Sequence, residues 1–394
     1  PGCRWIGNES GFAGATNWSF LRSKDVYPGY DKYEELQYGH ADGDKWVPGE
    51  CDVSIRPGWF YHPSEDKKVK TVPELVDLYY RSVGRNANFL LNFPVNRDGL
   101  ISPLDSANAV NYHQQIRHEL SHNLLTGIRP IASNERGKGF EASNVSDNKY
   151  DTYWATADNV KSAVLTFTLS KATKINRLLL QEYIPLGQRV KSFVVEYQFK
   201  GKWNAIDPKE ETTTIGYKRI LRFPTITTDK LRIRFIDARG CLCINNIAAY
   251  YSGSDDQKIT DRSELKVEGY SFVLSGVDPV EMNKAVDRNK LTTCFIKDNK
   301  VVIDLGQKRW VHALHYLPDQ NSPRKGLVSN YELSEGDQTG DAKVIATGEF
   351  SNIRNNPVWQ TVYFSPVYTR YITFKATRMV QDGESFGLAE IRIE

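Results

Sequence analysis

The spacing of apolar residues changes near residue 128, and this change constrains the fold more than any other feature of the sequence. Upstream of it, Thr71-Val72-Pro73-Glu74 has the form of a capping box with proline in the first turn, which predicts a helix that ends at Gly84. Residues 87–93 are an apolar run and predict a short strand buried on both faces. A second helix is expected from Ser102 to about residue 122. Strands that alternate with capped helices in this way indicate a β/α barrel.

Residues 1–125 are too few for a whole barrel, which takes about 250 residues. A half barrel by itself would leave two open sheet edges. We therefore expect part of a (β/α)8-type barrel, either in a fragment of a longer polypeptide or with its partner half elsewhere in the same molecule.

Helical spacing disappears beyond residue 128, and short segments alternate apolar and polar residues, for example 164–169, 193–197 and 231–235. This alternation is typical of antiparallel β-sandwiches. We predict two such domains, at residues 128–254 and 260–394. The predicted architecture is thus multidomain, with one β/α part followed by two sandwiches.

An internal repeat links the two predicted sandwiches. Residues 144–154 match residues 284–294, and the match aligns Asp147 with Asp287. An apolar strand follows each copy, and each domain ends on a closing strand. The pattern resembles the coagulation-factor type C domain, also called the discoidin domain, which is found in carbohydrate-binding module family 32.

Composition excludes several classes of protein. The net charge of +3 does not favour a nucleic acid or another polyanion as partner. The sequence has no run of about 18 apolar residues, so we expect no membrane span. Five cysteines are odd in number and sparse, which argues against a disulfide scaffold. Eight Trp and 21 Tyr suit a sugar-binding surface and a sandwich core equally well.

Three segments of the first domain carry a second resemblance. They are Arg4-Trp5-Ile6-Gly7-Asn8-Glu9, the stretch from Glu50 to His62, and the stretch from Gly84 to Pro94. Together they resemble the C-terminal half of the catalytic barrel of the α-L-fucosidases, glycoside hydrolase family 29, and most closely the branch that prefers α-1,3/1,4-linked fucose. The resemblance implies a retaining exo-glycosidase that needs no cofactor for catalysis. Its partner would be a fucosylated oligosaccharide or a glycoprotein glycan.

A retaining glycosidase uses two carboxylates about 5–5.5 Å apart, one as nucleophile and one as acid/base. Glu9 matches the acid/base of the family's Gly-Asn-Glu motif, and Trp5 supplies the apolar neighbour that such an acid requires. Glu50 is the rival, because residues 46–61 resemble the region in which the other branch carries its acid/base. The family's nucleophile motif does not occur in the sequence. We expect it upstream of Pro1, in the missing barrel half, and we expect the isolated chain to be inactive.

Further substrate-binding residues are expected around the strand that includes Asp52. Active sites of β/α barrels lie at the C-terminal ends of the strands, where Asp52, Arg56 and Trp59 are found. Arg56 would donate to sugar hydroxyls and Trp59 would stack on a sugar face. Alternatively, Arg56 pairs with Asp52 and only supports the strand end. The full predicted set is Arg4, Trp5, Asn8, Glu50, Asp52, Arg56 and Trp59.

The segment His118-Glu119-Leu120-Ser121-His122 fits the zinc-protease pattern, with two histidines four residues apart on one helical face. However, the helix is expected to be the last outer helix of the barrel, and no third ligand is evident. We interpret this segment as a polar helix face.

The discoidin resemblance implies a structural calcium ion between the Asp-bearing loop and a Glu of the closing strand. In the second sandwich the matching residues are Asp287, Thr292 and Glu390. In the first sandwich, Ala249 stands where the Glu is expected, which argues against calcium there.

The sequence therefore predicts part of a secreted or periplasmic bacterial α-L-fucosidase. The alternative is a non-catalytic carbohydrate-binding protein in which the barrel half is a remnant and the discoidin domains bind galactose or GlcNAc.

Overall fold

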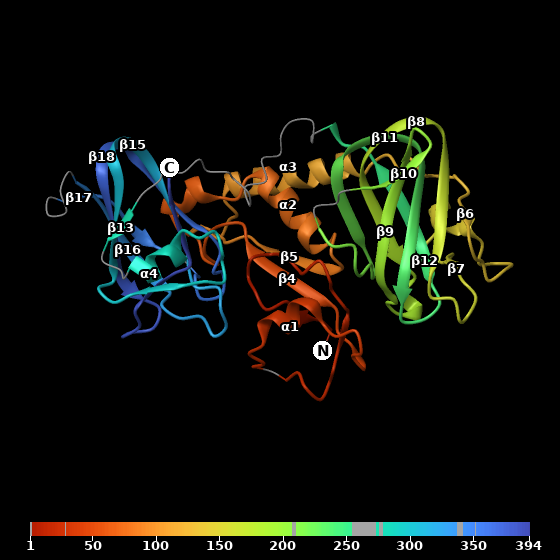
Figure 1. The fold of residues 1–394 in the computed structure, drawn as a ribbon, viewed down its shortest axis with the longest axis horizontal. Helices are drawn as coiled ribbons and strands as arrows, with labels where there is room; N and C mark the ends of the chain where they lie inside the picture. The colour runs from red at the N-terminus through yellow and green to blue at the C-terminus, as the bar shows by residue number, and fades with distance from the viewer. Residues whose placement is uncertain are drawn as a thin grey trace. The chain divides into compact units, whose positions relative to one another are not determined.

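The structure is a computed structural model that describes residues 2–27, 29–206, 210–253, 273–275, 279–336, 342–350 and 352–394. The described residues divide into two compact units. The first contains residues up to 56 and from 60 to 253, and the second contains residues 57–59 and those from 273 onward. Figure 1 shows the chain coloured along its length.

The β/α part of the first unit contains a parallel sheet with the strand order β1-β4-β5. β2 and β3 form a separate antiparallel pair. The elements are β1 (Arg4–Trp5), β2 (Phe20–Leu21), α1 (Tyr33–Tyr38), β3 (Lys45–Trp46), β4 (Gly49–Ser54), η1 (Pro63–Lys68), α2 (Val72–Ser82), β5 (Ala87–Asn92) and α3 (Pro103–Glu119). Among the described residues, this sheet has three strands and is not closed into a barrel.

The predicted helices are confirmed. α2 begins after Thr71, whose backbone N–H donates to Glu74 Oε2 at 2.7 Å, as a capping box requires. The prediction that the β5 segment is buried on both faces was wrong. Phe89 and Leu91 pack with the core that Leu75 and Leu78 of α2 contribute to, whereas Leu90 on the other face is 43% exposed. The two faces differ because α2 covers only one of them.

The first sandwich is a seven-stranded antiparallel sheet system in the order β10-β9-β11-β8-β12-β7, with β6 paired to β8. Its apolar core includes Trp154, Phe167, Leu180, Phe193 and Phe235. Its elements are β6 (Ile131–Ala132), η2 (Ala142–Ser146), β7 (Trp154–Ala155), β8 (Ala163–Glu182), η3 (Ile184–Leu186), β9 (Val190–Phe199), β10 (Lys202–Ala205), β11 (Arg219–Ala238) and β12 (Cys243–Tyr250). The predicted strands at 164–169, 193–197 and 231–235 lie within β8, β9 and β11.

The sandwich packs directly on the helices of the β/α part. Val76, Tyr80 and Ile116 share a buried cluster with Leu179 and Ile220 of the sandwich. Figure 1 shows α2 and α3, the helices that carry the first three residues. Burying apolar area from both parts joins them into one unit.

A buried polar network crosses the same contact. Arg177 on β8 donates to the Tyr80 hydroxyl at 3.0 Å and to Glu119 Oε2 at 3.2 Å, and Tyr80 donates to the same carboxylate at 2.5 Å. Glu119 is the glutamate of the zinc-protease-like segment, while His118 and His122 are exposed. Glu119 therefore pairs with the sandwich, in agreement with a structural role for this helix.

Glu182 ends β8 fully buried, and it accepts backbone N–H bonds from Arg189 at 2.6 Å, Val190 at 2.9 Å and Gly216 at 2.7 Å. Burial raises the pKa of Glu182 from its ordinary 4.5 to about 7, although the three amide donors oppose this shift. The folded protein thus retains a proton that the unfolded chain releases between pH 4.5 and 7.

We expect the free energy of unfolding of the first unit to fall as pH rises through this window, and to level off above it. Glu182→Gln should remove this component of the slope. Urea unfolding of both proteins at pH 5, 6, 7 and 8 measures it, and an unchanged slope in the variant would contradict the assignment to Glu182.

The second unit is also a β-sandwich. One sheet has the order β13-β15-β18-β16-β17 with β20 paired to β15, and β14 pairs with β19. Its elements are β13 (Val273–Ser275), α4 (Pro279–Met282), η6 (Asn283–Ala285), β14 (Cys294–Ile296), β15 (Lys300–Leu317), β16 (Val328–Gly336), β17 (Lys343–Glu349), β18 (Gln360–Met379), β19 (Phe386–Leu388) and β20 (Glu390–Ile393). Its core includes Tyr316, Phe374 and Phe386. The chain is thus multidomain and mostly β, as predicted.

The internal repeat is confirmed at the level of hydrogen bonds. Asp147 accepts from the Lys149 backbone N–H at 2.9 Å and from the Thr152 hydroxyl at 2.8 Å. Asp287 accepts equivalent bonds from the residues two and five positions later, at 2.7 and 2.8 Å. In both copies the residue after the aspartate has a positive φ, 60° and 63°.

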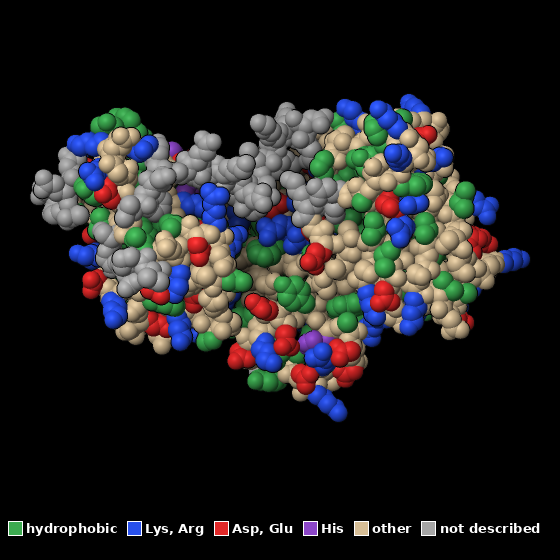
Figure 2. All heavy atoms as spheres, viewed as in Figure 1, with side chains coloured by type: hydrophobic (Ala, Val, Ile, Leu, Met, Phe, Trp, Pro, Cys, Tyr) green, Lys and Arg blue, Asp and Glu red, His purple; other side chains and the backbone are tan. Residues whose placement is uncertain are grey.

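All five cysteines are free. None of the described helices is long and apolar enough to cross a membrane. Basic and acidic side chains are interspersed over the described surface that Figure 2 shows.

Candidate active site

One face of the parallel sheet gathers several predicted site residues. Trp5 pairs with Glu50, and Glu50 pairs with Asn88, so these side chains point to the same side of the sheet. Asp52 follows on the same side of β4. Trp5, Glu50 and Asp52 are half-buried. We call these three residues the carboxylate face. Cys51 and Val53, the residues that alternate with Glu50 and Asp52 on β4, point the other way and are buried in apolar clusters.

The loop after β1 presents Glu9, and its sequence explains its shape. Gly7 has a φ of +84°, and a Cβ there would lie 2.5 Å from the Tyr33 carbonyl oxygen, so only glycine fits. Asn8 accepts from the Ser10 backbone N–H at 3.0 Å and donates to the Phe12 carbonyl at 3.2 Å. The Gly-Asn pair therefore bends the chain so that Glu9 follows the C-terminal end of β1.

The acidic groups of this region lie close enough to influence one another. Burial raises the pKa of Asp52, and the charges of Glu9 and Glu50 act in the same direction, whereas the hydrogen bond from Trp5 lowers it. That bond runs from Trp5 Nε1 to Asp52 Oδ1 at 2.8 Å. The Trp5 indole thus donates to Asp52, and the pKa of Asp52 responds to the charges of Glu9 and Glu50.

Arg4 is not on the carboxylate face. It is buried, and its guanidinium donates to the Leu36 carbonyl at 2.8 Å, the Val47 carbonyl at 2.6 Å and Asn17 Oδ1 at 2.7 Å. Burial lowers its pKa to about 10. Arg4 therefore joins β1 to the segments that surround it.

Arg56 is fully buried and pairs with Asp105 at 2.7 and 2.9 Å and with Asp66 at 2.9 Å. The alternative pairing with Asp52 was wrong, because the start of α3 supplies a carboxylate in the two-pronged geometry that a guanidinium prefers. Whether Arg56 also binds sugar stays a prediction. Trp59 is half-buried and falls in the second unit.

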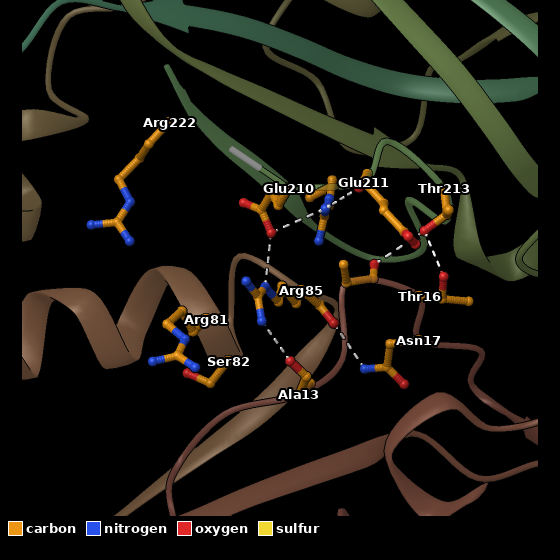
Figure 3. A network of polar contacts seen from close by, with 12 residues as sticks. Ala13, Thr16, Asn17, Arg81, Ser82, Arg85, Glu210, Glu211, Thr213 and Arg222 are labelled. Atoms are coloured by element: carbon orange, nitrogen blue, oxygen red, sulfur yellow. Dashed lines mark hydrogen bonds and ion pairs between the residues drawn. The ribbon is translucent and has the colours of Figure 1, made fainter. Parts of the chain in front are cut away.

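The first sandwich supports the chain that follows Glu9 (Figure 3). Thr16 donates its hydroxyl to Thr213 at 2.8 Å, and the Asn17 backbone N–H donates to Thr214 Oγ1 at 2.8 Å. Arg85 donates to the Ala13 carbonyl at 2.8 Å and pairs with Glu210 at 2.9 Å. The sequence analysis missed these residues, because the partners are up to about 200 positions apart and no local pattern marks them.

The three predicted calcium ligands lie together in the second sandwich. The Thr292 hydroxyl donates to Asp287. Burial raises the pKa of Glu390, and the charge of Asp287 raises it further. Glu390 is 2% exposed, and its Oε1 has no hydrogen-bond partner in the described part of the chain. Within that part, no cluster of three or more His, Cys, Asp or Glu side chains is arranged to hold a metal. A site here would have to include the Thr292 hydroxyl or backbone carbonyls.

The corresponding residue of the first sandwich is not Ala249, which is buried in the core. Instead Asn245 approaches the repeat loop, and its side chain donates to the Tyr150 carbonyl at 3.4 Å. The pairing of β12 with β8 has a register irregularity between Ile244 and Asn246, at the position of Asn245.

Comparisons with known proteins bear on both parts of the chain. The family model described as F5/8 type C domain matches residues 131–248. Alpha-L-fucosidase 1 of Arabidopsis thaliana is 37% identical over 279 residues, which are 68% of this chain and 54% of that protein. A Ruminococcus gnavus GH29 fucosidase, solved in complex with fucose, is 33% identical with a TM-score of 0.58, and the match covers 64% of this chain and 51% of that chain.

The chain is related to the α-L-fucosidases of glycoside hydrolase family 29. A solved family 29 member from an unknown rumen bacterium matches over 100% of this chain and 62% of its own, with 31% identity and a TM-score of 0.54. The chain spans about half the length of the curated relatives that it matches, 46% and 54%. The match to the F5/8 type C model falls on the first sandwich of this chain.

Proposed function

We propose that this chain forms part of a retaining α-L-fucosidase that releases fucose from α-1,3/1,4-fucosylated glycans. The observation that supports this proposal best is the loop Gly7-Asn8-Glu9. The loop carries a carboxyl group just after a parallel strand, and the charge of that group acts on Asp52, which accepts the Trp5 indole N–H. The C-terminal ends of parallel strands are where β/α barrels carry their active sites, and the β/α part would be the C-terminal portion of such a barrel.

On this proposal, Glu9 protonates the glycosidic oxygen as it leaves and then removes a proton from the water that releases fucose. Glu50, the rival acid/base, lies on β4, and its Oε2 accepts a hydrogen bond from the Cys3 thiol at 3.5 Å. The nucleophile would come from the N-terminal barrel half, because its motif does not occur in residues 1–394. We therefore expect no turnover from these residues alone.

The test is fucose release from p-nitrophenyl α-L-fucoside and from a Lewis trisaccharide by a polypeptide that joins this chain to a barrel half carrying a nucleophile. Proton NMR should show the α-anomer of fucose as the first product, because two displacements retain configuration. If neither substrate is hydrolysed, or if the β-anomer forms first, the proposal fails.

The match of residues 131–248 to the F5/8 type C model favours a second candidate function, carbohydrate binding without catalysis. Binding of galactose or GlcNAc by the chain, measured by calorimetry, would support it. Fucosidase activity that depends on Glu9 would favour the enzyme.

We propose in addition that Asp287, Thr292 and Glu390 bind a structural calcium ion. The unpartnered, buried Glu390 oxygen fits a hard cation, which prefers oxygen ligands. With 1 mM calcium and a Kd of about 10⁻⁴ M, the second unit should gain about 1.4 kcal/mol of stability. Differential scanning calorimetry with calcium, magnesium or EDTA measures it, and equal stabilisation of Glu390→Gln would contradict the site.

A further inference from the structure

Asp52 has a defined partner on the carboxylate face. Its Oδ1 accepts the Trp5 indole N–H at 2.8 Å. The Trp5 ring also packs edge-to-face against the Tyr33 ring, with the ring centres 5.4 Å apart and the planes at 73°. The indole is therefore held between β4 and the first turn of α1. An aromatic ring held at two points loses little rotamer freedom when a ligand stacks on it.

The surroundings of Asp52 are mostly acidic or apolar. Glu9 approaches from the loop after β1, and Glu50 lies two positions earlier on β4. The neighbouring Cys51 thiol is buried on the opposite face. On β5, Leu90 is paired with Asp52 and carries no charge. Among the strongest effects on the pKa of Asp52, the nearby charges are those of Glu9 and Glu50, and both raise it.

We propose that Asp52 is a positioning residue of the candidate active site, which fixes the orientation of Trp5 and places negative charge beside Glu9 without touching the reacting atoms. This inference rests on the proposed function. It replaces the sequence-based expectation that Asp52 binds sugar directly. The indole that it orients would be the surface against which the fucose ring packs.

Two substitutions separate the two effects. In Asp52→Asn, the amide oxygen still accepts the indole N–H, but the charge is gone. In Asp52→Ala, both the acceptor and the charge are gone. Asp237→Asn is the matched control, because it removes one negative charge from an exposed position of the first sandwich, where Asp237 pairs with Lys191.

The first experiment needs no catalytic activity. Nitrogen–proton NMR spectra of the chain, labelled at tryptophan, contain one indole signal for each of its eight tryptophans, and Trp5→Phe identifies the signal of Trp5. We expect this signal to shift with pH in one step as Asp52 titrates. Asp52→Asn should abolish the step, Asp52→Ala should move the signal at every pH, and Asp237→Asn should change nothing. If Asp52→Ala left the position of the Trp5 indole signal unchanged, the proposal would be overturned.

The second experiment uses the polypeptide that contains this chain and the barrel half. We expect Asp52→Ala to lower kcat by roughly 10- to 100-fold, because the indole loses its orientation. Asp52→Asn should retain most of kcat, because its amide oxygen still accepts the indole N–H. If instead both variants raise KM equally and leave kcat unchanged, Asp52 binds sugar directly and the proposal is wrong.

The two experiments also separate this inference from the proposed function. Should the wild type hydrolyse no fucoside, the function fails, while the NMR titration still decides whether Asp52 orients Trp5. Should the wild type be active and the NMR signal not respond, only the positioning role of Asp52 fails.

Discussion

Glu9→Gln is expected to lower kcat for a Lewis trisaccharide by roughly 10²- to 10⁴-fold in the polypeptide that joins this chain to a nucleophile-bearing barrel half. Glutamine has nearly the shape of glutamate, so the loop that Gly7 and Asn8 form should not change. It can neither protonate the glycosidic oxygen nor activate water. The effect should be smaller for the first step with p-nitrophenyl fucoside, because nitrophenolate leaves without a proton.

The comparison with Glu50→Gln makes this prediction decisive. Glu50 and Glu9 are both acidic neighbours of Asp52, but Glu50 lies on the strand itself, within reach of the Cys3 thiol. We expect Glu50→Gln to retain at least a tenth of the activity on the activated substrate. Burst kinetics with both substrates measure the two steps separately. The opposite result, loss of activity in Glu50→Gln and retention in Glu9→Gln, would transfer the acid/base role to Glu50.

Local features of the fold could be predicted from the sequence, because their causes are local. The capping box before α2 involves Thr71 and Glu74, three residues apart. The repeat turns involve Asp147 with Thr152 and Asp287 with Thr292, five residues apart. In each case the hydrogen-bond partners lie within five residues of one another, so residue type and spacing determine the geometry.

Partners that depend on topology could not be predicted. Arg56 pairs with Asp105 rather than with Asp52, since the contact depends on where α3 packs. The apolar run that includes Leu90 predicted a strand buried on both faces. In the structure, α2 covers only one face of β5, and Leu90 lies on the other. Asn245, at a register irregularity in β12, contacts the repeat loop, whereas Ala249 is buried in the core. Sequence spacing contains no information on such contacts.

The candidate site divides in the same way. Gly7, Asn8 and Glu9 form one loop whose shape follows from a positive φ and short side-chain bonds. The hydrogen bond between Trp5 and Asp52 joins β1 to β4. The two residues are 47 positions apart in the sequence, and only the parallel pairing of the strands brings them together.

The buried contact between β8 and the helices supports a second large prediction. Arg177 is fully buried, Glu119 is 2% exposed, and Tyr80 donates to the same carboxylate. Burial raises the pKa of the Tyr80 hydroxyl, so it stays a donor at all physiological pH values. Glu119→Ala should reduce the free energy of unfolding of the first unit by about 3–5 kcal/mol, because a buried guanidinium loses its carboxylate.

Hydrogen exchange of the α2 and α3 amides measures this loss in the first unit by itself, even though the chain contains two units. Lys191→Ala is the control, since Lys191 and Asp237 form an exposed pair worth less than about 1 kcal/mol. The double variant Arg177→Met with Glu119→Leu removes both charges and should recover much of the stability, because an apolar pair of similar volume avoids the desolvation cost. If the double variant were instead as unstable as the sum of the single ones, the ion pair itself, rather than the unpaired charge, would determine how firmly the sandwich joins the β/α part.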